Sequence, residues 1–125
     1  MSDPALLCER LGDVLLVLER AARRFAEIGS ADDFLRSDEG LERMDAICMV
    51  LVATGEAVRR LDRETSGSLF ARYPAVPWSA VKGIRDVLAH GYFDVDAEQI
   101  FNICRDDLPV LIATLRRMIA DFEPV

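Results

Sequence analysis

The chain has 125 residues, of which 51% are apolar and 30% are charged, and its formal net charge is −7. This length and composition predict one globular domain, residues 1–125, with a hydrophobic core of its own. The acidic balance disfavours a general coat for nucleic acid, because non-specific binding needs cations that neutralise phosphates, but it does not exclude a local basic site.

The sequence contains no apolar run long enough to span a bilayer, and acidic residues stand early in the chain. We therefore expect no signal peptide, no membrane segment and a cytoplasmic location. Three cysteines, Cys8, Cys48 and Cys104, lie far apart and in no metal-binding spacing. We interpret them as small buried hydrophobic residues in a reducing compartment, and we expect neither a metal nor a cofactor.

Helical periodicity dominates the first half of the chain. Asp3 and Pro4 are typical of a helix start, where a carboxylate cap precedes a proline, and Gly29 is expected to end this helix. The segment 31–36 is either one turn of helix or a loop. A second long helix follows it, and Gly55 within that helix is expected to permit a close crossing with another helix.

The second half begins with a break in the pattern over residues 62–78, which predicts a connection. A third helix then starts at Trp78. Asp96 and Gln99 resemble a capping box for a fourth helix, which Pro109 is expected to kink or restart. No segment alternates as a strand does, so the sequence predicts an all-α, up-and-down bundle of four to five helices.

The stretch GIRDVLAHGYFDVD contains the only histidine in the chain, His90. Asp86 lies four residues before it and would share its helix face. Arg85 lies five residues before it, about 140° around a helix, so the two side chains converge only if the helix ends at His90, where Gly91 supplies a break. The helix C-terminus and Asp86 would both favour the protonated ring, so a raised pKa is expected for His90.

Capping is the simplest role for a histidine at a helix end. The proximity of Arg85, Asp86, His90 and Tyr92 favours a phosphate-handling site instead. Metal-free RNA cleavage needs a base on the 2′-hydroxyl and an acid on the leaving oxygen, and one histidine does not easily serve as both. We therefore expect a homodimer with a composite site on its twofold axis, where two Arg85 guanidinium groups stabilise the phosphorane.

The run YPAVPWSAVKGIRDVLAHGYFDVDAEQIFNICRDDLPVLIATL resembles the HepT-like toxins of the HEPN superfamily. Their hallmark is an arginine, four residues, a histidine, one residue and a tyrosine, which here are Arg85, His90 and Tyr92. The resemblance implies a dimerising helical bundle and a metal-independent endoribonuclease that is the toxin of a type VII HepT/MntA toxin–antitoxin system. Its partner would be an MntA-like minimal nucleotidyltransferase that neutralises the toxin by AMPylation of Tyr92. Asp86 stands where many members have asparagine, and this carboxylate would repel phosphate unless Arg85 or His90 neutralises it.

Two other interpretations of the sequence stay open. The chain could be a non-catalytic helical binding subunit of a minimal nucleotidyltransferase, which the acidic net charge favours. It could also be a helical bundle in which His90 only caps a helix.

Overall fold

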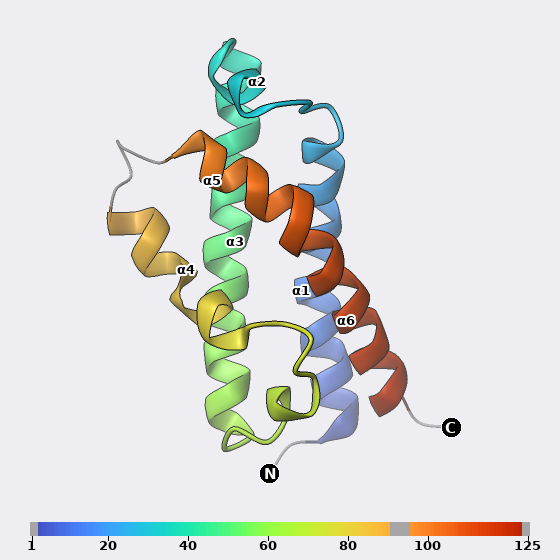
Figure 1. The fold of residues 1–125 in the computed structure, drawn as a ribbon. Helices are drawn as coiled ribbons and strands as arrows, with labels where there is room; N and C mark the ends of the chain where they lie inside the picture. Colours follow the sequence, from blue (N-terminus) through green and yellow to red (C-terminus); the bar gives the residue numbers. More distant parts are fainter. Residues whose placement is uncertain (1–2, 91–95, 124–125) are drawn as a thin grey trace.

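The computed structural model describes residues 3–90 and 96–123, and at Ala89 and His90 it describes the backbone alone. Helices make up all the regular structure of these residues, which confirms the predicted all-α class. Figure 1 shows α1 and α4 running in one direction and α3 and α6 in the other, with α4 crossing α3 obliquely. In the described ranges, no helix is both long and apolar enough to cross a membrane. The helices are α1 (Pro4–Phe25), α2 (Ala31–Leu35), α3 (Asp38–Glu64), α4 (Trp78–His90), α5 (Ala97–Asn102) and α6 (Leu108–Phe122).

The first helix starts as the sequence predicts and ends earlier. The Asp3 carboxylate accepts a hydrogen bond of 3.0 Å from the Ala5 N–H, as an N-cap does. The expected stop at Gly29 is wrong, because α1 ends at Phe25 and the next residue has ordinary right-handed helical geometry. Gly29 instead donates its N–H to the Asp33 carboxylate at 2.7 Å, which ties the linker to α2.

Both ends of the segment between α3 and α4 are defined by specific local contacts. Ser66 and Gly67 have positive φ angles of 54° and 77°, and the Gly67 N–H bonds to the Asp62 carbonyl at 2.8 Å, which closes the end of α3. The segment then forms a short 3-10 turn, Phe70–Arg72. The predicted connection is therefore confirmed, although α3 extends three residues into it and Trp78 already belongs to α4.

The last two helices form one nearly continuous helical path. The Asp96 carboxylate caps α5 by accepting from the Glu98 N–H at 2.9 Å. A π-helical turn, Ile103–Asp107, joins α5 to α6, and Pro109 stands in the first turn of α6. Proline lacks an N–H, and its ring clashes with the carbonyl four residues earlier. The helical hydrogen-bond pattern therefore changes to the wider π-helical turn before Pro109, and α6 starts as a new helix, as predicted.

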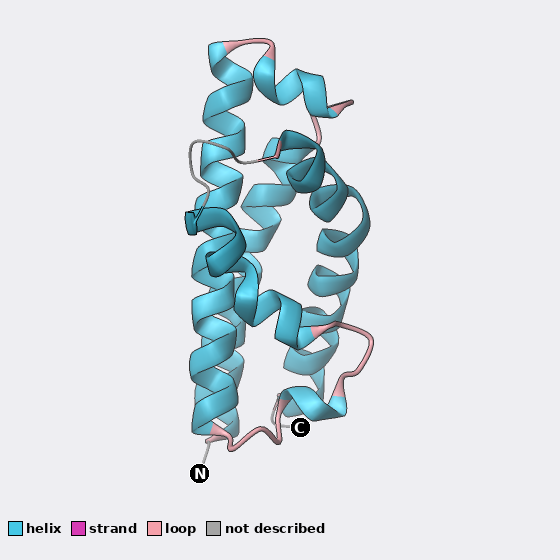
Figure 2. Cartoon of the chain, turned by 60° about the vertical axis from the view of Figure 1, so that its left-hand side comes forward, coloured by secondary structure: helices cyan, strands magenta, loops and turns pink. Residues whose placement is uncertain are grey.

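The hydrophobic core lies between α1, α3 and α6, with α2 and α5 closing one end. Figure 2 shows the same bundle from the side of α4. The largest fully buried side chains come from α1, α2, α3, α5 and α6, and include Leu11, Leu18, Phe34, Ile47, Ile100, Leu115 and Met118. These apolar stripes are core, as their helical spacing predicts.

Candidate active site

The helix α4 is anchored at its start and pressed against α3 in its middle. The Trp78 indole N–H donates to the Tyr73 carbonyl at 2.8 Å, and its ring packs on Phe70 at a centroid distance of 4.4 Å. At Gly55 of α3 a Cβ would lie 2.7 Å from the Val81 carbonyl oxygen, so only glycine permits this approach. The predicted close helix crossing at Gly55 is therefore confirmed, and the partner helix is α4.

Arg85 is the arginine that the sequence singles out, and it lies on the accessible surface of α4. Its side chain is 59% exposed, and its Nη1 lies 3.3 Å from Oε1 of Glu56 on α3. The pair is exposed, so it contributes little to stability, and a phosphate could compete for the guanidinium. The contact holds the guanidinium beside α3 while leaving its other donors accessible.

The other predicted site residues lie at the end of the same helix. Asp86 is exposed on α4, next to Arg85. His90 is the last described residue of α4, and its side chain is not among those that the structure describes. Tyr92 falls in residues 91–95, outside the described ranges. The expected convergence of Arg85, Asp86 and His90 therefore stays a prediction.

Glu56 is a site residue that the sequence analysis missed. It contacts Arg85 although the two residues are 29 positions apart, so no motif spacing reveals the pair. The available signal was its position directly after Gly55, because a residue beside a close helix crossing reaches the facing helix.

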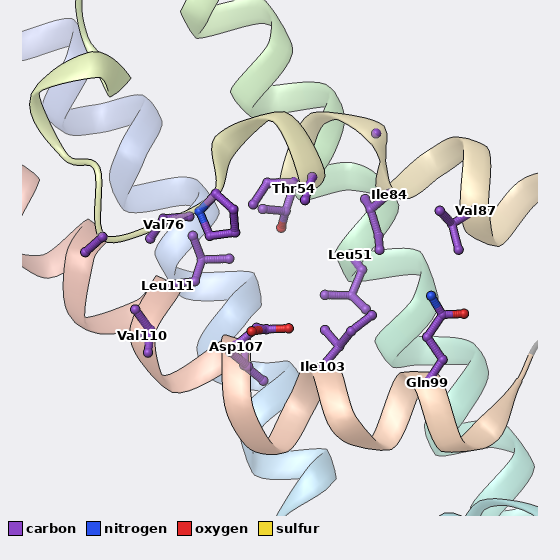
Figure 3. Close-up of a pocket in the computed structure, with 16 residues that line it drawn as sticks. Leu51, Thr54, Val76, Ile84, Val87, Gln99, Ile103, Asp107, Val110 and Leu111 are labelled. Carbon is purple, nitrogen blue, oxygen red and sulfur yellow. The ribbon is translucent and has the colours of Figure 1, made fainter.

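An apolar groove of about 430 Å³ lies on the other flank of α4, between α3, α4, and the α5–α6 path. Figure 3 shows side chains of α4 and of the α5–α6 path facing each other across it. Val87 and Val110 stand at its rim and are 49% and 44% exposed. On its floor, the Thr54 hydroxyl is buried and has no hydrogen-bond partner among the described residues. The described residues thus leave open an apolar surface that runs from the start of α4 to one helical turn before its end.

The cysteines behave largely as structural residues. Cys104 is buried, and Cys8 and Cys48 are half-buried, so the expectation of burial holds fully only for Cys104. Burial raises the pKa of the Cys48 thiol to about 11 and that of Cys104 to about 12, which disfavours the reactive thiolate. Within the described ranges, no group of three or more His, Cys, Asp or Glu side chains is placed to hold a metal ion.

Fold and site together define a small helical bundle that presents an exposed guanidinium in the C-terminal half of α4. Residues 15–118 match the family model described as Ribonuclease HepT-like. The chain belongs to the HepT-like ribonuclease family. This membership confirms the resemblance stated from the sequence and the expected class of enzyme.

Three relatives illustrate the relationship. A protein of Methanocaldococcus jannaschii, provisionally named an RNase, is 32% identical over 92 residues, which cover 74% of this chain and 70% of the relative. A protein of Caldanaerobacter subterraneus subsp. tengcongensis, also provisionally named an RNase, is 34% identical over 82 residues, covering 66% and 67%. A protein of Thermococcus cleftensis, provisionally named ribonuclease HepT, is 31% identical over 67 residues, covering 53% and 56%. No solved structure matches the chain.

Proposed function

We propose that the chain is a metal-independent endoribonuclease and the toxin of a type VII HepT/MntA toxin–antitoxin system in the cytoplasm. The observation that supports this most is the exposed Arg85 on α4, five residues before the helix-terminal His90, inside the region that matches the ribonuclease family. The catalytic residues are Arg85, His90 and Asp86, in one domain formed by residues 1–125.

The proposed reaction is an internal transesterification. A neutral imidazole of His90 takes the proton of the 2′-hydroxyl, the 2′-oxygen bonds to phosphorus, and the bond from phosphorus to the 5′-oxygen breaks. A protonated imidazole gives its proton to that leaving oxygen. Arg85 donates to the phosphorane oxygens, where negative charge accumulates, and Asp86 orients or charges the ring. The products are a 2′,3′-cyclic phosphate and a 5′-hydroxyl.

Because each chain has a single histidine, the reaction requires a homodimer that brings two imidazoles to one phosphate. The apolar groove supports this assembly, since Val87, one helical turn before the end of α4, and Val110, at the other end of the groove, are both half exposed. A second copy covering this surface would bury apolar area close to the site. Val87→Glu is expected to yield monomers in analytical ultracentrifugation and to lose cleavage. Dimers of this variant that persist at the same protein concentration would contradict a dimer interface at the groove.

The proposed partner is an MntA-like minimal nucleotidyltransferase that acts as antitoxin by AMPylation of Tyr92. Added phosphate and adenosine two residues after His90 would repel and block an incoming RNA strand. The chain made together with such a partner should gain mass equal to one or more AMP groups, and Tyr92→Phe should abolish the gain. If the mass of the chain stays unchanged in the presence of an active partner, this mode of neutralisation is contradicted.

The test of the activity uses the partner-free chain, an RNA oligonucleotide and excess chelator. The chain should cleave the RNA and leave 2′,3′-cyclic phosphate ends, and it should not cleave the same strand made with 2′-deoxy sugars. His90→Ala should abolish cleavage with an unchanged helical circular dichroism spectrum. Cleavage that survives His90→Ala refutes the proposed mechanism.

The acidic net charge of −7 favours a second candidate, a non-catalytic subunit that binds the nucleotidyltransferase. This candidate predicts tight binding to the partner and no RNA cleavage by the partner-free chain. Toxicity on expression that is relieved by the partner supports the ribonuclease, whereas a harmless chain without cleavage supports the subunit.

A further inference from the structure

Five of the fifteen lysine and arginine residues belong to the C-terminal half of α3 and to α4, the two helices that cross in Figure 1. Arg59, Arg60 and Arg63 belong to α3, and Lys82 and Arg85 belong to α4. Steps of three and four residues place the members of each set on one side of their helix. We call these five residues the α3–α4 basic flank, and it lies on the opposite side of α4 from the rim of the apolar groove.

Direct contacts hold the basic flank together. The Arg59 guanidinium donates to the Lys82 carbonyl at 2.8 Å, and the Lys82 ammonium lies 2.9 Å from the Asp62 carboxylate. A hollow of about 410 Å³ opens between the two helices, and it is lined by Arg59, Asp62, Arg63, Ser79, Lys82 and Gly83. Cations of both helices therefore border one open depression on the surface.

Four carboxylates share this surface with the five cations, so the flank keeps a local excess of one positive charge in a chain whose net charge is −7. One of the four is Asp86, which is exposed on α4 and follows Lys82 by four residues on the same helix face. Glu56 contacts Arg85, Asp62 contacts Lys82, and Glu64 lies 3.7 Å from Arg60. Such partly exposed pairs are worth at most about 1 kcal/mol each. A phosphate that approaches the flank can therefore exchange with a carboxylate at little cost.

The cations of the flank lie in a row that begins at Arg85. Glu56, which holds Arg85, is followed on the same side of α3 by Arg59 and then by Arg63, with about 6 Å of helix rise between the two arginines. A row of cations at successive helix turns suits a polyanion better than a single phosphate, and guanidinium groups bind phosphate oxygens in a bidentate way. An RNA strand whose cleaved phosphate lies at Arg85 would meet these residues next.

We propose that the α3–α4 basic flank is the track of the RNA strand leaving the cleavage site, with Arg59, Arg63 and Lys82 contacting successive phosphates. The proposal rests on the proposed ribonuclease function and adds the path and the contacts of the substrate. An acidic protein segment is the competing occupant of the flank, and the experiment below separates the two.

The experiment compares Arg59→Gln/Arg63→Gln with the unmutated chain on two substrates in chelator. One substrate is a dinucleotide, which reaches only the cleavage site, and the other is a twelve-nucleotide RNA on the order of the site sizes known for single strands. On the longer RNA, we expect KM to rise about 25-fold at about 0.1 M salt, since each lost phosphate contact costs on the order of fivefold. The kcat should stay within about twofold, and dinucleotide cleavage should not change.

A binding measurement supports the kinetics. With His90→Ala added to prevent cleavage, the slope of log Kd for the longer RNA against log salt should fall by about 0.7 for each contact removed. The control Arg23→Gln changes an exposed arginine on α1, away from the flank, and should leave the slope unchanged.

The outcomes separate this inference from the function on which it rests. An unmutated chain that cleaves neither substrate refutes the proposed function. A chain that cleaves both, with KM and salt slope unaffected by Arg59→Gln/Arg63→Gln, refutes the track and leaves the flank to an acidic protein partner. Equal losses on both substrates also refute the track, because they show damage to the cleavage site itself.

Discussion

The close approach of α4 to α3 at Gly55 offers a quantitative test of how the site is built. In Gly55→Ala, the new Cβ would lie 2.7 Å from the Val81 carbonyl oxygen and 2.9 Å from Cγ2 of Ile84, where ordinary contacts begin at 3.4 Å. The closest atom belongs to the backbone of α4, so a side-chain rotation cannot relieve the clash. The helix α4 must move away from α3, together with Arg85.

Two opposing terms set the size of the effect. Alanine gains about 1 kcal/mol of helix propensity over glycine. Overpacking in a well-packed contact costs typically 1–3 kcal/mol, and a backbone clash belongs at the upper end of about 3 kcal/mol. We expect Gly55→Ala to lower the free energy of unfolding by about 2 kcal/mol.

The measurement is urea unfolding followed by circular dichroism at 222 nm, with all variants at one protein concentration because association would shift the midpoint. Gly12→Ala is the matched control, since Gly12 is also inside a long helix and its new Cβ would meet nothing within 4 Å. This control should be stabilised by about 1 kcal/mol. A Gly55→Ala chain as stable as the Gly12→Ala chain would refute the close-crossing argument.

Three further predictions concern single side chains. Glu56→Gln removes the carboxylate that competes with phosphate for Arg85, so RNA should bind between about 1.5- and 5-fold more tightly in a titration, and weaker binding would contradict the competition. Tyr73→Phe removes a hydrogen bond of 2.7 Å to α6 and should cost about 1 kcal/mol in urea unfolding, and an unchanged midpoint would count against that bond. At pH 8 about one Cys48 thiol in a thousand is ionised, because burial raises its pKa to about 11. Iodoacetamide should therefore label Cys48 and Cys104 slowly, and the labelling rate should rise about tenfold for each pH unit. Rapid labelling at pH 8, measured by peptide mass spectrometry, would contradict the burial of these thiols.

The sequence predicts the long helices well because their stability depends on one repeated feature, a buried apolar stripe. In α1 this stripe runs through Leu7, Leu11, Val14 and Leu18, all of which are buried. The five residues of α2 are too few for such a stripe, so the sequence could not distinguish helix from loop there. Gly29 misled the prediction because a glycine after a stripe usually ends the helix, whereas here the chain turns earlier and Gly29 bonds to Asp33.

The features of the candidate site also fall into those that the local sequence predicts and those that depend on how the helices pack. Arg85 follows from local spacing and lies on α4, which the described residues follow as far as His90. The Glu56 contact and the joining of Arg59 to Lys82 depend on how α4 lies on α3, which no local pattern encodes. Gly55 gave the one sequence signal for that packing, and it predicts a crossing without naming the helix that crosses.

The account depends most on Arg85 acting directly on RNA. The decisive measurement is the single-turnover cleavage rate of an RNA oligonucleotide in chelator for Arg85→Ala and for Arg116→Ala. The two arginines are matched, since their side chains are 59% and 60% exposed and each pairs with a glutamate on another helix. We predict that Arg85→Ala slows cleavage by about 10²- to 10³-fold, as removal of a transition-state donor does, while Arg116→Ala stays within about twofold. Equal rates for the two variants would contradict the central claim.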